Sequence, residues 1–187
     1  MNTVSGRSAG GRPASEPSAS EPSAGEPSAG EPSAGEAFNR TRQYFEDFAV
    51  GDTVLSPGRT VDIADISAFA GLTGDHYPLH VNEEYGRGTR FGGRIAHGPL
   101  TFALAVGQIA LTGFLGDAVV AFLECQGLRA LAPVRPGDTI RARAEVAATE
   151  PGSRPTHGTL RLDYTVLNQK DEDVMTFRMV LLARRRS

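Results

Sequence analysis

The 187-residue chain contains only one cysteine, Cys125. A single thiol excludes a disulfide framework within the chain. No stretch of about 18 apolar residues runs without polar interruption, so we expect no membrane span. The formal net charge of −3 gives no electrostatic reason to expect a nucleic-acid partner. These absences predict a soluble, cytoplasmic protein that binds neither membranes nor nucleic acids.

Residues 1–37 lack any sustained apolar pattern, and residues 16–35 repeat the pentad Glu-Pro-Ser-Ala-Gly/Ser four times. Such a composition buries too little apolar surface to offset chain entropy, which predicts a disordered tail. An interaction arm or a semi-rigid spacer is the alternative. The tail has neither the apolar core of a signal peptide nor the acid-poor composition of a transit peptide. Residues 38–187 are expected to form one folded domain. This length is sufficient to bury a single hydrophobic core without disulfides or structural metal ions.

The first half of this domain carries signals for a strand and then a helix. A short strand is expected at residues 53–55, between turn sequences. A helix is expected at residues 62–72, capped by Asp62 and ended by Gly71 and Gly74. Its apolar residues recur at helical spacing on one face, namely Ile63, Ile66, Phe69 and Ala70.

The most apolar stretch runs from Pro99 to Leu115. Proline is favourable at a first helical position, and little polar surface follows, so we expect a helix that is buried nearly all round. After Gly116, four long segments are rich in alternating or β-branched residues: 118–132, 138–150, 158–169 and 173–184. The expected fold class is α+β, a long antiparallel sheet against one buried helix. The final run Arg184–Arg186 is expected to be a solvated terminus.

The candidate chemistry lies between the two helices. Asp75 and His80 are five positions apart on a segment stiffened by Pro78, and Gly98 stands at the start of the apolar helix. Backbone N–H groups at a helix start have no intrahelical acceptor. An acid, an imidazole and a free N–H are the parts needed for proton transfer beside a polarised carbonyl. Taken singly, Asp75 is better explained as a cap of the next turn and His80 as a hydrogen-bonded loop histidine; together with Gly98 they favour catalysis.

Other chemistries have weaker signals. Asp75, His80 and His97 could supply three metal ligands, but their spacing matches no strong ligand pattern, so no metal is expected. Cys125 lies in the middle of an expected strand, where a small core residue is the simpler interpretation. No Gly-x-Ser-x-Gly sequence is present for a serine nucleophile. Three arginines are candidate phosphate contacts, with a solvated surface as the alternative: Arg87, Arg90 and Arg94.

The segment from Leu72 to His80, followed by Phe91–Gly98, resembles the signature of the MaoC-like (R)-specific enoyl-CoA hydratases. The turn Pro133–Asp138 is also similar to a turn between their long strands. The resemblance covers about residues 44–184 and implies a single hot-dog domain, in which the sheet wraps around a central helix. It further implies an acyl-CoA substrate in fatty acid metabolism, a homodimer or higher homo-oligomer, and no cofactor, because CoA is part of the substrate.

Position by position, the resemblance implies that Asp75 and His80 form the catalytic dyad and that the N–H of Gly98 holds the thioester oxygen. It places Tyr77 and His97 among the substrate-binding residues; a His97 that orients the loop by hydrogen bonding is the alternative. Tyr77 stands where the family commonly has asparagine. Some members carry a serine near the catalytic carboxylate, where this chain has Ala105–Gly107.

The reaction implied by this resemblance is the reversible hydration of a trans-2-enoyl-CoA to a (R)-3-hydroxyacyl-CoA, the work of a hydro-lyase. Two alternatives remain open. One is acyl-CoA thioester hydrolysis, which hot-dog proteins also perform. The other is a non-catalytic hot-dog subunit that binds acyl chains or a partner.

Overall fold

A computed structural model describes residues 42–186. The tail expected at residues 1–37, and the first residues of the domain expected to begin at residue 38, lie outside this range. The described elements run in the order η1 (Phe45–Asp47), β1 (Thr53–Leu55), β2 (Arg59–Thr60), α1 (Ile63–Thr73), α2 (Pro78–Val81), α3 (Glu83–Arg87), α4 (Gly98–Leu111), β3 (Val119–Ala130), β4 (Thr139–Pro151), β5 (His157–Leu167) and β6 (Asp173–Arg184).

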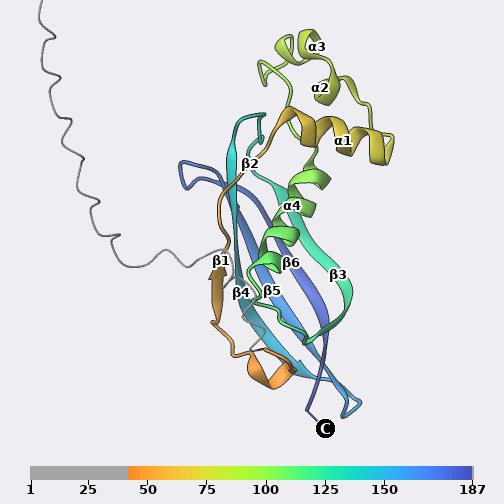
Figure 1. The fold of residues 1–187 in the computed structure, drawn as a ribbon, viewed down its shortest axis with the longest axis vertical. Coiled ribbons are helices and arrows are strands. Elements are labelled where there is room, and N and C mark those ends of the chain that lie inside the picture. The colour runs from red at the N-terminus through yellow and green to blue at the C-terminus, as the bar shows by residue number, and fades with distance from the viewer. Residues whose placement is uncertain (1–41, 187) are drawn as a thin grey trace, which may run out of the picture. The chain divides into compact units, whose positions relative to one another are not determined.

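One antiparallel sheet forms the body of this part of the chain. Its strands lie in the order β1-β4-β5-β6-β3, with the short β2 paired to β4. The sheet curves around α4, and α1, α2 and α3 gather at one end of it, beside the start of α4 (Figure 1). The expected α+β architecture, a sheet wrapped around a central helix, is therefore confirmed.

The alternation expected in the fourth strand explains how the sheet separates core from solvent. Ile140, Ala142, Ala144 and Val146 on β4 are fully buried, whereas the arginines and the glutamate between them are partly or fully exposed. Successive side chains of a strand point to opposite faces, so the apolar set faces α4. Ala105 and Ile109 of α4, both fully buried, belong to the same hydrophobic core.

Aromatic residues complete this core. Tyr164 on β5 stacks on Phe177 on β6 with ring centres 4.7 Å apart, and Phe102 of α4 meets Phe177 edge to face at 4.8 Å. Cys125 on β3 is partly buried and packs against the same core. Burial raises the pKa of the Cys125 thiol above its ordinary value, which suits a core residue better than a nucleophile.

Helix α1 follows the expected pattern closely. The carboxylates of Asp62 and Asp65 form a reciprocal capping box, in which the Asp62 N–H donates to Asp65 Oδ2 at 2.9 Å. The helix ends at Gly74, whose φ of +78° is the left-handed conformation that glycine adopts at low cost. The chain therefore turns out of the helix at Gly74, directly before Asp75.

The expectations for the central helix were wrong in two respects. Helix α4 ends at Leu111 rather than Leu115, because Gly113 and Gly116 adopt left-handed φ values of +73° and +52°. It is also not buried all round: Leu111 is 62% exposed, and the neighbouring small residues Ala103, Gly107 and Ala110 are exposed too. The face of α4 turned away from the sheet is thus apolar but uncovered.

Two short elements were not expected. Pro78–Val81, predicted as a loop, forms the single-turn helix α2 with proline at its first position. Arg59–Thr60 forms the strand β2, which pairs with the start of β4. Proline is the first residue of α2, and Pro57 precedes β2 by two positions. A proline favours a turn in sequence but is compatible with either element.

The C-terminal arginines are not a solvated terminus, contrary to expectation. Arg185 forms an ion pair with Glu46 at 2.9 Å, and Arg186 forms one with Asp47. Arg184 donates from Nε to the main-chain oxygen of Gln43 at 2.7 Å. The end of β6 is therefore fastened to η1.

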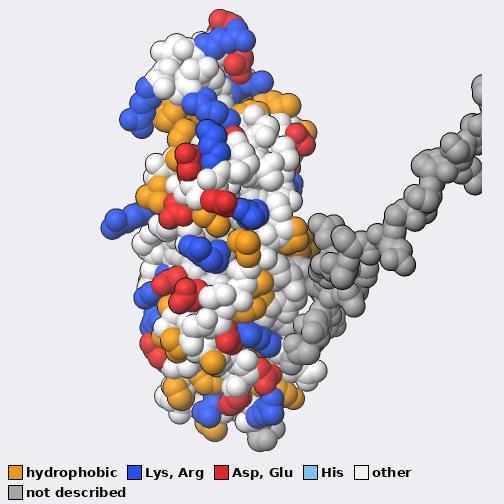
Figure 2. Space-filling view, turned by 90° about the vertical axis from the view of Figure 1, so that its left-hand side faces the viewer, with side chains coloured by type: hydrophobic (Ala, Val, Ile, Leu, Met, Phe, Trp, Pro, Cys, Tyr) orange, Lys and Arg blue, Asp and Glu red, His pale blue; other side chains and the backbone are white. Residues whose placement is uncertain are grey.

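The surface of the described part mixes charges of both signs. Lys and Arg side chains alternate with Asp and Glu side chains over the face shown in Figure 2. On the sheet, Arg178 pairs with Asp163 at 2.6 Å and Arg161 with Glu150 at 2.9 Å. Among residues 42–186, the helices are too short or too polar to traverse a lipid bilayer.

Candidate active site

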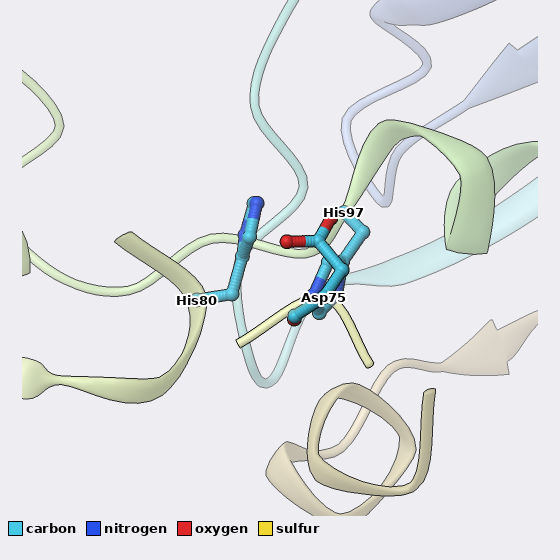
Figure 3. A group of neighbouring side chains, drawn as sticks. All are labelled: Asp75, His80 and His97. Atoms are coloured by element: carbon cyan, nitrogen blue, oxygen red, sulfur yellow. Dashed lines mark hydrogen bonds between the residues drawn. The ribbon is translucent and has the colours of Figure 1, made fainter. Parts of the chain in front are cut away.

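The candidate site is assembled from three segments at the end of the molecule where α1–α3 lie. Asp75 follows α1, His80 lies on α2, and His97 immediately precedes α4 (Figure 3). One possible ligand atom from each of these three side chains lies within 4.8 Å of the other two. The structure thus brings together Asp75 and His80, as the sequence predicted, and adds His97 to the group.

The loop geometry around Asp75 is fixed by local hydrogen bonds. The Asp75 N–H donates to Thr73 Oγ1 at 3.2 Å, and the Tyr77 N–H donates to Asp75 Oδ1 at 3.2 Å. The second bond closes a turn over the aspartate side chain, a conformation that Asp favours. Asp75 is exposed, and its carboxylate extends toward His80 (Figure 3).

The neutral form of His80 can be assigned from its partner. His80 Nδ1 lies 2.8 Å from the main-chain oxygen of Ile95. A carbonyl oxygen only accepts, so Nδ1 carries the proton and Nε2 of the neutral ring is left as an acceptor. His80 therefore offers a lone pair beside the acceptor oxygens of Asp75.

His97 forms a hydrogen bond with the main chain of the loop that carries Asp75. Its side chain is 0% exposed, and its Nε2 lies 3.0 Å from the main-chain oxygen of Asp75, to which it donates. Its ring packs against Phe69 at 5.0 Å. Its Nδ1 is buried without a hydrogen-bond partner in the described part of the chain. This environment favours the interpretation of His97 as a residue that orients the loop over that of a direct substrate contact.

A cavity of about 220 Å³ opens beside these residues. His80 and Gly98 both line it, and most of its remaining wall is apolar, including Ile95, Leu131 and Met175. Gly98 is the first residue of α4, so its N–H has no intrahelical acceptor. The His80 ring and the start of α4 therefore meet at one apolar cavity, whereas Asp75 is not part of its lining.

The three side chains fit a metal poorly. Each histidine already directs one nitrogen at a main-chain carbonyl, and the two rings are stacked with their planes only 28° apart. Lone pairs of imidazole nitrogens lie in the ring plane. Two stacked rings with centres 3.8 Å apart are not the usual arrangement of ligands that direct their in-plane lone pairs at one ion about 2.1 Å from each nitrogen. The geometry thus disfavours the metal alternative.

Tyr77 lies next to the dyad but faces outward. It is 55% exposed, its ring centre is 6.3 Å from that of His80, and its hydroxyl lies 3.3 Å from the hydroxyl of Tyr85. The hydrogen bond with Tyr77 raises the pKa of Tyr85 above its ordinary value. The aromatic side chain of Tyr77 thus lies beside His80 and is exposed to solvent.

Two contributors to the site were not found from the sequence. The main-chain oxygen of Ile95 orients His80, and a backbone acceptor leaves no side-chain signal. Tyr85 meets Tyr77 across eight positions, a contact that depends on the turn at Asn82. The stretch Ala105–Gly107, which carries no serine, lies on α4, and Ala105 is fully buried there.

The three candidate phosphate-binding arginines differ in their surroundings. Arg87 pairs with Glu84 and lies 3.5 Å from Glu83, and Arg94 pairs with Glu83 at 2.8 Å. Those two guanidinium groups keep the pKa of Glu83 below its ordinary value. Arg90, in contrast, lines the cavity together with Phe91.

Comparison with known proteins identifies what this arrangement resembles. The family model described as "MaoC like domain" matches residues 47–168, more than half of the chain. The (R)-specific enoyl-CoA hydratase of Rhodospirillum rubrum is 40% identical over 108 residues, which cover 58% of this chain and 72% of the relative. The 3-hydroxybutyryl-CoA dehydratase of Methylorubrum extorquens is 37% identical over 111 residues, covering 59% and 68%. Protein MaoC of Klebsiella aerogenes, 39% identical, is matched over only 30% of its own length.

Solved structures agree. The MaoC-like dehydratase from Rhodospirillum rubrum superposes with a TM-score of 0.71 at 32% identity, covering 78% of this chain and 99% of that one. A conserved hypothetical protein of Mycobacterium tuberculosis with a double hot-dog fold gives a TM-score of 0.67 at 25% identity, covering 76% of this chain and 44% of that one. The sheet wrapped around α4 is therefore a hot-dog fold, as expected.

Proposed function

The chain belongs to the MaoC-like domain family, and from this premise we propose that it catalyses the reversible hydration of a trans-2-enoyl-CoA to a (R)-3-hydroxyacyl-CoA. Relatives named as hydratase and dehydratase support a hydratase-type enzyme. The observation that carries the finer proposal is the approach of Asp75 to His80 beside a helix start that lines the same cavity as His80.

In this proposal the thioester oxygen accepts a hydrogen bond from the N–H of Gly98. That N–H has no intrahelical acceptor, and the positive end of the α4 dipole lies at the same place. Negative charge that develops on the oxygen is thereby stabilised, and C3 of the conjugated double bond becomes electrophilic. Most of the cavity wall is apolar, which lowers the local dielectric constant and strengthens this interaction.

The attacking water lies between Asp75 and His80. Both groups present acceptors, the Asp75 carboxylate and the His80 Nε2, so one water donates one hydrogen to each and directs its lone pair at C3. As the C3–O bond forms, one of the two groups takes a proton from the water. That proton, or the equivalent one held by the Asp75–His80 pair, is then delivered to C2. The net change is the addition of OH to C3 and H to C2, with no oxidant, reductant or further cofactor. CoA enters as part of the substrate.

Neither the Asp75–His80 pair nor the Gly98 N–H is sufficient alone for efficient hydration. General acid–base assistance contributes about 10²–10⁴-fold, and an oxyanion donor about 10²–10³-fold. The proposed reaction therefore needs the dyad and the Gly98 N–H to act on the same bound thioester.

A homodimer is part of the proposal. Among residues 42–186, strand β3 lies at one edge of the sheet and pairs with β6 alone. It exposes large apolar side chains along its length and just beyond it: Val120, Phe122, Leu123, Leu128 and Leu131. A long apolar edge strand associates readily with another strand, and a second copy would cover it. Light scattering coupled to size exclusion measures the resulting mass directly.

The function is tested with a panel of trans-2-enoyl-CoAs of different chain lengths. Loss of the enoyl absorbance without release of free thiol is the expected result for a hydratase. Thiol release without loss of that absorbance would show a thioesterase instead. Tight acyl-CoA binding with no turnover at any chain length would show a non-catalytic binding subunit. Chiral analysis of the 3-hydroxyacyl product tests the (R) configuration separately.

A further inference from the structure

The segment from α3 to the start of α4 contains one arginine whose guanidinium forms no ion pair with a described carboxylate. Glu83 and Glu84 supply two carboxylates, and these pair with Arg87 and Arg94. Arg90, which lies between those two arginines in sequence, has no carboxylate partner among residues 42–186. Arg90 therefore carries the one positive charge of this segment that no described carboxylate neutralises.

Arg90 is also the one of these arginines that belongs to the cavity. It lines the cavity together with His80, Gly98 and Phe91. Its guanidinium carbon lies 4.8 Å from the centre of the Phe91 ring, which supports the side chain from one face. Arginine side chains are visible at the end of the molecule formed by α2 and α3 (Figure 2). A cation held over an aromatic ring at the rim of an apolar cavity is prepared to bind an anion that enters with the substrate.

We infer that Arg90 binds an anionic group of the substrate, and thereby selects among enoyl thioesters. This inference rests on the proposed function, since it assigns a ligand to the same cavity. The shared chemistry is a group with two anionic oxygens, which a guanidinium contacts through two parallel hydrogen bonds. In an acyl-CoA, such a group is supplied either by the phosphates of the CoA portion or by a carboxylate at the far end of the acyl chain.

The size of the effect follows from the exposure of Arg90. Hydrogen bonds to charged groups are stronger than neutral ones, but solvent weakens them at exposed positions. We therefore expect Arg90→Gln to raise the KM for the matching substrate about tenfold while kcat changes less, because the contact is made equally in ground and transition states. Arg90→Lys keeps the charge but loses the paired geometry, so its KM should lie between the two.

The experiment measures hydration of three substrates by wild type and by Arg90→Gln. Crotonyl-CoA carries the phosphates, crotonyl-pantetheine lacks them, and fumaryl-CoA carries phosphates and an acyl carboxylate. A KM effect of Arg90→Gln with crotonyl-CoA that disappears with crotonyl-pantetheine identifies the phosphates as the ligand. An effect confined to fumaryl-CoA identifies the acyl carboxylate. Equal KM values for wild type and Arg90→Gln on both CoA substrates would overturn the inference.

Arg87→Gln is the matched control, because Arg87 is engaged by Glu83 and Glu84 and does not line the cavity. It should shift none of the three KM values. Titration of wild type and Arg90→Gln with CoA and with fumaryl-CoA by calorimetry separates this inference from the proposed function. If the wild type binds both ligands but hydrates none of the enoyl thioesters, the proposed reaction fails while a weaker affinity of Arg90→Gln still supports the anion contact. Unchanged affinity of Arg90→Gln for both ligands would reject it.

Discussion

The rings of His80 and His97 are stacked, with centres 3.8 Å apart and planes inclined by 28°. Each ring donates to a main-chain carbonyl of a different segment: His80 to Ile95, which precedes α4, and His97 to Asp75, which follows α1. The two histidines therefore tie the ends of two helices together across the site. One of them is buried, and the other reaches the cavity.

This arrangement predicts that His97 acts on catalysis through Asp75. His97→Phe keeps a ring against His80 and Phe69 but removes the N–H donated to the Asp75 carbonyl. We expect the free energy of unfolding to fall by about 1–3 kcal/mol and kcat to fall with it, because the carbonyl is left without its donor. His97→Gln retains an amide N–H for the same carbonyl and should recover part of the lost kcat. Equal kcat values in His97→Phe and wild type would contradict a positioning role.

The proposed role of the Gly98 N–H as an oxyanion donor can be tested with a variant that lacks this N–H. Proline is tolerated at a first helical position, where its missing N–H has no intrahelical acceptor. A Cβ at Gly98 would meet no atom within 4 Å, so the matched variant Gly98→Ala keeps the N–H at little steric cost. We expect Gly98→Pro to lower kcat by about 10²–10³-fold relative to Gly98→Ala. Circular dichroism of both variants checks that α4 is retained.

A close backbone contact holds the segment that leads to the site. A Cβ on Gly86 would lie 2.6 Å from the carbonyl carbon of Gly93, so α3 and the segment before α4 approach each other only because Gly86 has no side chain. Gly86→Ala should lower the free energy of unfolding by about 1–3 kcal/mol and reduce activity. Gly71 in α1 has open space around it, so Gly71→Ala should raise stability by about 0.5–1 kcal/mol. Thermal unfolding of both variants measures this opposite pair of effects.

The clamp between η1 and the C-terminus predicts a stability that depends on pH. The main-chain N–H of Arg186 and then the guanidinium of Arg185 lower the pKa of Glu46 below its ordinary value of about 4.3. A carboxylate with a depressed folded-state pKa stabilises the protein above the unfolded pKa, and this contribution is lost as the pH falls through the folded pKa. Glu46→Gln should therefore lower the melting temperature at pH 7 but not in strong acid.

Glu145→Gln is the control for this comparison, because Glu145 is exposed on β4 and forms no ion pair in the described part of the chain. It should have the same melting temperature as wild type at both pH values. A difference between Glu46→Gln and wild type that persists unchanged below the lowered pKa would exclude the proposed linkage.

Helices and strands in which apolar residues recur at a regular spacing were predictable from the sequence. Helix α1 is capped by Asp62, buries Ile66 and Ala70 of the expected stripe and ends at Gly74, as expected, whereas Ile63 is 37% exposed and Gly71 lies within the helix instead of ending it. The alternation of Ile140, Ala142 and Ala144 likewise defined β4 and its buried face. These signals are local, since each depends on residues within a few positions of one another.

Features that depend on tertiary contacts were not predictable. The apolar pattern after Pro99 continues past the end of α4 at Leu111, so the pattern alone did not locate that end. The left-handed turn at Gly116 packs closely against Arg42, a contact that is distant in sequence. The three C-terminal arginines resembled a solvated tail because their partners lie about 140 positions earlier, namely the main-chain oxygen of Gln43 and the carboxylates of Glu46 and Asp47. In the site, the sequence identified Asp75, His80 and Gly98 as candidates, but the burial of His97 became apparent only once the loop and α4 were placed together.

The most direct test of the proposed dyad is the turnover of crotonyl-CoA by Asp75→Asn and His80→Gln, measured together with their melting temperatures. Both variants are expected to keep a melting temperature close to that of wild type, because neither side chain is buried. Each should lower kcat by about 10²–10⁴-fold, since each removes one of the two acceptors that orient and deprotonate the water. Folded variants that hydrate crotonyl-CoA at nearly the wild-type rate would contradict the account.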